Sequence, residues 1–339
     1  MTILLVALLL YAVKETPSPR PLALRWQALL DRTLDLAPAA DGERIYVPVA
    51  GGTLVALGAQ DGKLRWRAEL GGEIGAAPVA DGRAVYLASD KGEGGFLRAL
   101  SAATGIVLWQ TTLAQAARHV LISQDRLYVI AADGTVAALE RSSGRTLWRF
   151  DARACAPPLL AFDRLYVGTA SGDILALDPL GRIVARWRAA SPPQRLALDA
   201  KGTLYCATTD GRLLAFTQGG GAPRWTARAG AAVLALAASD DLCLAASLDN
   251  FVRAYTRAGA RLWKRQLAGR VVATPLVENG VAVVTPLTGD LTFVLDMRTG
   301  RTLAFLPVPE PTGAPPLRAN DLILFTTRSG LLAFGPARP

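Results

Sequence analysis

The sequence predicts an all-β fold, an eight-bladed β-propeller of four-stranded antiparallel blades in which an N-terminal strand completes the last blade. Three observations predict it: tryptophans recur about every forty residues, each repeat reads as four short strands, and the two chain ends supply complementary parts of one repeat. Repeats of this length built from short strands are typical of propeller blades. The tryptophans lie at Trp26, Trp66, Trp109, Trp148, Trp187, Trp225 and Trp263.

The third repeat illustrates the four strands expected in every blade. We expect strands at residues 120–122, 127–131, 135–139 and 146–150. The second of these is rich in β-branched and aromatic residues, which favour strands. Asp133-Gly134 predicts a tight hairpin, because glycine accepts a positive φ, and Ser143-Gly144 predicts the next turn.

The tryptophan belongs to a spaced motif that begins with a small residue and passes through a turn glycine. In the second repeat this motif consists of Ala99, Ser101, Gly105 and Trp109. It recurs as Ala56, Gly58, Gly62, Trp66, as Ala138, Glu140, Gly144, Trp148, and as Ala215, Thr217, Gly221, Trp225. We expect all seven indoles to dock neighbouring blades, where a buried indole contributes roughly 3–5 kcal/mol. Ala304 stands at the tryptophan position of the seventh repeat, so that blade contact is expected to be the weakest.

The two ends of the chain set the number of blades. Seven complete repeats run from about residue 36 to about residue 308, and an eighth, from Gly313 to Pro339, supplies only three strands. Residues 22–30, which include Trp26, would supply the fourth strand and close the ring. Closure removes exposed sheet edges. We therefore predict one propeller domain over residues 22–339, monomeric.

The first 21 residues differ in composition from the propeller. An apolar run from Thr2 to Val13 precedes a proline-rich linker that ends at Pro21. Twelve helical residues span about 18 Å, less than a bilayer core of about 30 Å. This length suits an export signal, although no basic residue precedes the run and no cleavage motif or lipidation cysteine follows it. We expect an export or anchor-like segment, a candidate for membrane association, and a periplasmic or membrane-anchored protein that faces the periplasm. A cytoplasmic protein with an apolar tail is the alternative.

The inventory of reactive residues argues against catalysis. His119 is the only histidine, which excludes an HExxH zinc motif and histidine-rich metal sites. The chain has no P-loop, G-x-S-x-G or G-x-G-x-x-G motif. Cys155, Cys206 and Cys243 have no CxxC spacing, and the last two lie in apolar strand patterns typical of buried residues. The net charge of +9 comes from scattered arginines, so we predict no nucleic-acid partner, and no catalytic, cofactor or metal site.

Eight blades marked by this tryptophan motif resemble the propeller of the pyrroloquinoline quinone (PQQ) dehydrogenase superfamily, over nearly the whole chain after residue 21. One branch, the quinoprotein dehydrogenases, implies a quinone, a calcium ion and adjacent cysteines, and the cysteines here are not adjacent. The aspartates fall mostly in hairpin turns: Asp41-Gly42, Asp81-Gly82, Asp133-Gly134 and Asp210-Gly211. The other branch, the outer-membrane assembly factor BamB and its relatives, has similar length and no cofactor. The chain departs from that branch in lacking a lipidation cysteine and a long loop insertion, and in its basic charge.

The resemblance to the BamB branch implies a non-catalytic, protein-binding scaffold of the bacterial cell envelope, with protein partners in an envelope assembly complex. A PQQ-dependent oxidoreductase and a ligand-binding sensor propeller are the alternatives. The segments that enter the innermost strands carry basic residues: Arg118, His119, Arg153, Arg195 and Arg270. We expect them to converge at one mouth of the central channel and form a partner-binding ring suited to an acidic partner or an anionic ligand. The alternative is solvated arginines spread around the rim.

Overall fold

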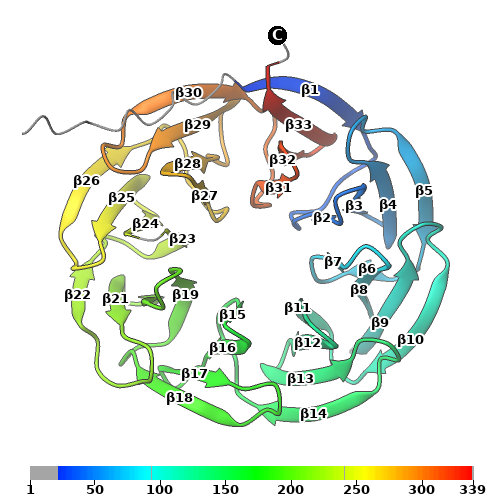
Figure 1. The fold of residues 1–339 in the computed structure, drawn as a ribbon, viewed down its shortest axis with the longest axis horizontal. Coiled ribbons are helices and arrows are strands. Elements are labelled where there is room, and N and C mark those ends of the chain that lie inside the picture. Colours follow the sequence, from blue (N-terminus) through cyan, green and yellow to red (C-terminus); the bar gives the residue numbers. More distant parts are fainter. Residues whose placement is uncertain (1–21, 93, 240, 338–339) are drawn as a thin grey trace, which may run out of the picture.

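The computed structural model describes residues 22–92, 94–239 and 241–337. These residues form eight antiparallel blades arranged in a ring, with blades following one another in chain order (Figure 1). The predicted eight-bladed, all-β propeller is therefore confirmed. The apolar segment and proline-rich linker, residues 1–21, lie outside the described residues.

The strands of each blade follow one another from the channel to the outer wall (Figure 1). From the channel outward, blade 1 comprises β2 (Ala39–Ala40), β3 (Arg44–Val49), β4 (Thr53–Gly58) and β5 (Leu64–Glu69). Blade 2 comprises β6 (Glu73–Ile74) and β7 (Val79–Ala80), then β8 (Ala84–Lys91), β9 (Gly94–Ser101) and β10 (Val107–Leu113). Blade 3 comprises β11 (Ala117–Ser123), β12 (Arg126–Ala131), β13 (Thr135–Glu140) and β14 (Thr146–Asp151), and blade 4 comprises β15 (Leu159–Ala161), β16 (Arg164–Gly168), β17 (Asp173–Leu177) and β18 (Ile183–Arg188).

Blades 5 to 8 follow the same order, and the last one draws on both ends of the chain. Blade 5 comprises β19 (Pro193–Leu198), β20 (Leu204–Thr208), β21 (Arg212–Phe216) and β22 (Trp225–Arg228), and blade 6 comprises β23 (Val233–Ala238), β24 (Leu242–Ser247), β25 (Phe251–Thr256) and β26 (Arg261–Gln266). Blade 7 comprises β27 (Leu276–Glu278), β28 (Val281–Val284), β29 (Leu291–Asp296) and β30 (Thr302–Pro307). Blade 8 comprises β31 (Leu317–Ala319), β32 (Leu322–Thr327), β33 (Gly330–Pro336) and β1 (Leu22–Leu29).

Strand β1 closes the ring as predicted. It pairs antiparallel with β33 from Leu22 opposite Pro336 to Leu29 opposite Gly330, and Trp26 lies opposite Ala333. Blade 8 thus holds the first and last described strands of the chain in one sheet. The ring can open at this blade only if β1 separates from β33.

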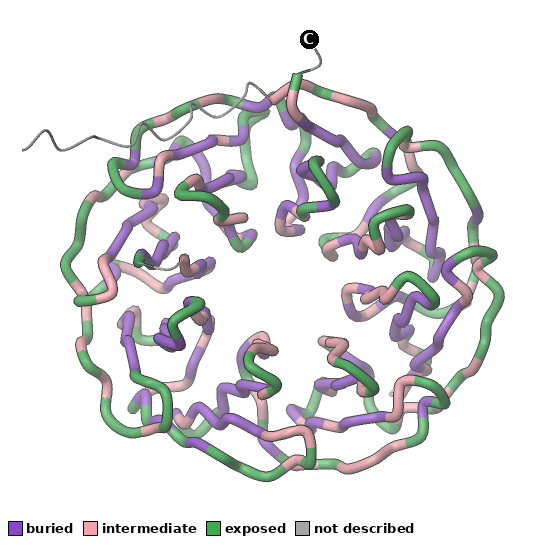
Figure 2. Tube along the Cα trace, in the orientation of Figure 1, coloured by how far each residue is buried: buried purple, intermediate pink, exposed green. Residues whose placement is uncertain are grey.

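The core lies between blades and not within a single layer. The middle strands of each blade are buried on both faces because each sheet packs against a neighbour on either side (Figure 2). One apolar cluster, for example, joins Val47 and Leu57 of blade 1 to Leu324 and Leu331 of blade 8. Outermost strands alternate between inward and exposed side chains, so the exposed residues form the outer wall (Figure 2).

Every tryptophan bonds to the next blade. Each indole Nε1–H donates to a backbone carbonyl in the turn between the third and fourth strands of the following blade, at 2.8–3.1 Å. The pairs are Trp26–Ala59, Trp66–Ala102, Trp109–Arg141, Trp148–Pro179, Trp187–Thr217, Trp225–Arg257 and Trp263–Met297. These bonds span seven of the eight blade contacts in the described chain.

Two blades depart from this arrangement. In blade 4, Trp187 pairs with Ile174, and Ala185 takes the place opposite the motif alanine, yet the indole is 2% exposed and still bonds to the next blade. In blade 7, Ala304 occupies the tryptophan position, and the ring of Phe305 packs edge-on against Phe293 with centroids 5.3 Å apart. The contact between blades 7 and 8 therefore lacks an indole bond.

Candidate binding surfaces: the outer wall, the seam pocket and the channel

The eight outermost strands form a wall whose outer edges pair with no further strand among the described residues. One isolated bridge, between Trp187 of β18 and Gly221, is the exception to the unpaired edges. Several of the outermost strands also expose large apolar side chains there. Unpaired backbone groups beside apolar side chains can add a strand from another protein. These exposed residues are Leu24 and Leu29 of β1, Leu64 of β5, Val107 and Leu108 of β10, Ile183 and Val184 of β18, Leu262 of β26, and Leu303 and Phe305 of β30.

Strand β10 differs most from a protected edge. It is seven residues long, Leu108 is 58% exposed, and no charged residue stands between Arg98 and Arg118. All other outermost strands except β30 contain at least one arginine, and Arg301 directly precedes β30. Charged side chains normally discourage pairing at sheet edges. Strand β10 is therefore the edge best suited to accept an extended partner.

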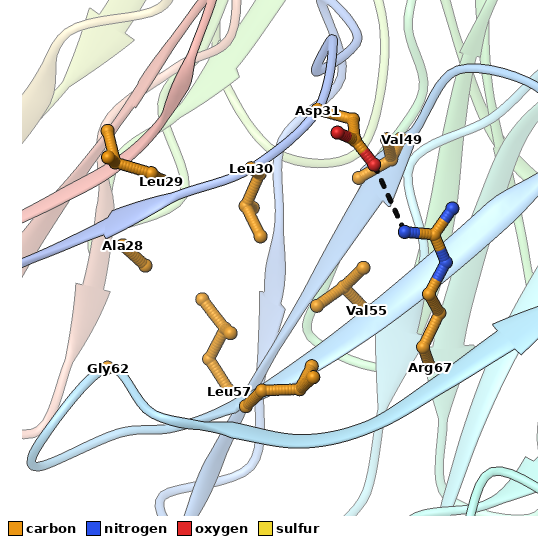
Figure 3. A pocket seen from close by; sticks show the side chains of 10 residues that line it. Ala28, Leu29, Leu30, Asp31, Val49, Val55, Leu57, Gly62 and Arg67 are labelled. Carbon is orange, nitrogen blue, oxygen red and sulfur yellow. Dashed lines mark hydrogen bonds and ion pairs between the residues drawn. The ribbon is translucent and has the colours of Figure 1, made fainter.

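A pocket of about 460 Å³ opens at the seam between the closing strand β1 and blade 1 (Figure 3). Leu30, Val55 and Leu57 line it, and an ion pair of 3.0 Å between Asp31 and Arg67 borders it. Such an apolar depression with a polar rim can receive one apolar side chain of a partner.

The central channel forms a second cavity, of about 620 Å³. Its lining includes residues from every blade or from the segment that leads into it, for example Ala77 of blade 2 and Leu236 of blade 6. The charged or titratable side chains that line it are Asp35, Arg118, His119 and Arg195.

Three of the five predicted basic residues thus share the channel: Arg118, His119 and Arg195. The innermost strand β11 begins three residues earlier than expected, and its register shifts between Ala117 and His119, so Arg118 and His119 belong to the strand itself. The register of β19 shifts in the same way just before Arg195. Sequence periodicity carries no signal for these bulges.

Arg153 and Arg270 are not among the residues that line the channel. Arg153 follows β14 with a φ of +47° and lines a separate depression with Asp133, Asp151 and Cys155. Arg270 is exposed, and its carbonyl accepts the N–H of Leu287. Both arginines therefore lie on exposed connections, outside the lining of the shared cavity.

Electrostatics couple the three channel residues. Burial, together with the charges of Arg195 and Arg118, lowers the pKa of His119 below its usual range. Burial also lowers the pKa of Arg195, whose Nη1 donates to the carbonyl of Gln194 at 2.8 Å. Arg118 lies 3.8 Å from Asp90, at the limit of an ion pair, and burial raises the pKa of that carboxyl. Sequence reasoning missed Asp35 and Asp90, because nothing in the repeat distinguishes them from turn aspartates.

The two cysteines that the sequence places in apolar strand patterns lie in the core. Cys206 and Cys243 are fully buried, and burial raises the pKa of both thiols. Within the described ranges, no group of three or more His, Cys, Asp and Glu side chains could hold a metal ion, and no helix could span a membrane.

Comparisons with known proteins agree on the architecture. The family model of the outer membrane protein assembly factor BamB matches residues 23–112, 92–195 and 185–337. BamB from Moraxella catarrhalis is 21% identical, with a TM-score of 0.77, and the match covers 94% of this chain and 100% of that one. Two further structures share the fold. The computationally designed protein Ika8 is 15% identical with a TM-score of 0.78, and the match covers 91% of this chain and 98% of that one. The C-terminal WD40 domain of Sif2 is 11% identical with a TM-score of 0.76, and the match covers 94% of this chain and 99% of that one. No curated protein sequence matches the chain.

Proposed function

The chain belongs to the family of the outer membrane protein assembly factor BamB, and from this premise we propose that it is a non-catalytic protein-binding scaffold of the bacterial cell envelope. It works in the periplasm, either free or held at a membrane by residues 1–21, as one component of an envelope assembly complex. Its partners are proteins that bind in extended conformation. A rigid ring of blades presents their docking edges in a fixed arrangement.

The observation that carries this proposal is the uncharged, exposed edge of β10. Val107 and Leu108 are 42% and 58% exposed there, while Gln110 and Thr112 offer only neutral polar groups. An added strand would satisfy the backbone donors and acceptors of this edge, and its alternate side chains would cover the apolar residues. The seam pocket gives a second contact that could receive an apolar side chain of the same class of partner.

The test compares two leucines in the same position of different blades. Leu108 and Leu262 each directly precede a docking tryptophan and are exposed, but Leu262 has Arg261 and Lys264 as neighbours. The tagged chain and its Leu108→Arg and Leu262→Arg variants would be purified from the envelope fraction of cells that make it, and bound proteins would be identified by mass spectrometry.

We expect outer-membrane assembly proteins to co-purify with the unmodified chain and with Leu262→Arg, and their yield to fall roughly tenfold or more with Leu108→Arg, because a charge at the centre of a desolvated interface costs several kcal/mol. Equal yields from both variants would remove β10 as the docking edge. Absence of assembly proteins from every preparation would refute the proposed scaffold role.

A further inference from the structure

The channel concentrates its positive charge on one side. Arg118 and His119 come from blade 3 and Arg195 from blade 5, on either side of the apolar segment Pro157–Leu159 of blade 4. The charges of Arg195 and Arg118 both lower the pKa of His119, so the imidazole lies within electrostatic reach of both guanidinium groups. Two guanidinium groups at one cavity create a local positive potential, to which His119 adds when it is protonated.

This cationic side is incompletely neutralised within the chain. Among the described residues, Arg195 has no ion pair, and its hydrogen bond runs to the backbone of Gln194. The Oε1 atom of Gln194 is itself buried without a hydrogen-bond partner in the described structure. A half-buried guanidinium without a carboxylate carries a desolvation cost that an incoming anion would offset.

The rest of the channel lining has different chemistry. Blade 6, which packs against blade 5, contributes Leu236, and the segment that leads into blade 7 and its first strand contribute Val272 and Leu276. Asp35, in the segment that leads into blade 1, is the one acidic side chain of the lining among the described residues. An anionic group is therefore attracted to the side of blades 3 and 5 and repelled from that of Asp35, while the apolar walls accept a hydrocarbon body.

We propose that the channel binds an organic carboxylate with an aliphatic body, whose carboxylate lies between Arg195, His119 and Arg118. This ligand site goes beyond the scaffold role and does not depend on it. The same chemistry is presented by a free aliphatic acid and by the C-terminus of a polypeptide that ends in an aliphatic residue.

Binding at this site is coupled to a proton. A bound carboxylate favours the protonated form of His119, so affinity rises as pH falls from 7.5 to 5.5. The charged groups around His119 are Arg195 and Arg118, with Asp90 beside Arg118 and Asp35 in the lining of the same channel. The ordinary pKa of a histidine lies within this pH range, so we expect His119 to account for the change.

The test is isothermal titration calorimetry of the purified chain with octanoate, and with octanamide as a neutral analogue of the same length. N-acetyl-Ala-Leu and its C-terminal amide form the peptide arm. The variants are Arg195→Met, Arg118→Met and His119→Gln. Arg270→Met is the matched control, because that arginine enters an innermost strand but lies outside the cavity. Unchanged midpoints of thermal unfolding establish that each variant is folded.

We expect the acids to bind at least tenfold more tightly than their amides, and Arg195→Met or Arg118→Met to weaken acid binding roughly tenfold, as for a lost charge-assisted hydrogen bond. His119→Gln should abolish the pH dependence, and Arg270→Met should change nothing. Tighter binding of octanoate identifies a free acid as the ligand type, and tighter binding of the peptide identifies a polypeptide C-terminus. Equal binding of acids and amides, or an equal effect of Arg270→Met, would overturn the proposal and leave the scaffold role untouched.

Discussion

At the scale of single residues, six of the seven indole contacts in the described chain combine a hydrogen bond with a turn glycine that packs against the indole ring, and Trp187 is the exception. Trp66 illustrates both: its Nε1 donates to the carbonyl of Ala102 at 2.8 Å, and Gly105 lies against its six-membered ring. The sequence motif predicts the tryptophan and the glycine. It cannot predict the acceptor carbonyl, because that atom lies more than thirty residues away in the next blade.

The hydrogen bond can be separated from the apolar contact at Trp66. Trp66→Phe keeps most of the buried ring but leaves the carbonyl of Ala102 without its donor, so we expect a loss of about 1–2 kcal/mol in the free energy of unfolding. Trp66→Ala should cost about 3–5 kcal/mol. Urea unfolding followed by circular dichroism measures both, and equal losses would show that the ring area contributes nothing beyond the bond.

The glycine can be tested with a matched position. Gly105 has a φ of +73°, and a Cβ there would lie 2.6 Å from Cε3 of Trp66, whereas Gly82 has a φ of +83° with open space around it. Gly82→Ala should therefore cost about 1 kcal/mol for the backbone conformation alone. Gly105→Ala should cost about 1–3 kcal/mol more because the methyl group overpacks the indole. Chemical denaturation of both variants checks this, and similar losses would contradict the packing argument.

Asp249 provides a prediction that depends on pH. Burial opposes its ionisation, but hydrogen bonds from Arg253 and Ser247 outweigh burial and lower its pKa to about 2. A carboxyl whose pKa is lower in the folded than in the unfolded state stabilises the fold above its unfolded pKa of about 3.9, and this stabilisation disappears as pH falls toward 2. Asp249→Asn should thus cost roughly 2 kcal/mol at pH 7 and little at pH 2. Unfolding of both proteins across this range tests it; a difference independent of pH would contradict it.

At the scale of elements, the repeat predicted the strands well and their irregularities poorly. Strands β12, β13 and β14 lie within one residue of their expected bounds, because turn glycines and alternating side chains mark them. Innermost strands carry bulges, as at Arg118, that reflect packing around the channel. The same limit applies to the candidate site: the sequence located the basic residues near the innermost strands, but only the path of each connection separates Arg195, inside the cavity, from Arg270, outside it.

Strand β1, which closes the ring, is expected to stabilise the propeller and to keep it monomeric. Deleting residues 22–30 removes β1, exposes the edge of β33 and uncovers apolar residues such as Leu331 and Ala333. We expect the shortened chain to unfold at lower urea concentration and to self-associate, because an open apolar edge invites pairing. Urea unfolding and size-exclusion chromatography with light scattering measure this on a chain that starts at Asp31 and on a matched chain that starts at Leu22. A monomer of unchanged stability would contradict the role of β1.

At the scale of the whole molecule, the propeller separates two kinds of surface. The outer wall offers unpaired, partly apolar edges to extended proteins, while the channel gathers charge from blades that are distant in sequence. Composition predicted neither the uncharged edge of β10 nor the presence of Asp35 and Arg195 in one channel, because both depend on how strands far apart in the chain are placed around one ring.

The most direct test of the scaffold account is photo-cross-linking in cells, with a benzoylphenylalanine placed at Leu108 or, as the control, at Leu262. The account expects adducts to outer-membrane assembly proteins from position 108 and few or none from position 262, since β10, unlike β26, presents an edge free of charge. Adducts of the same proteins in equal amount from both positions, or none from position 108 in a folded chain, would contradict it.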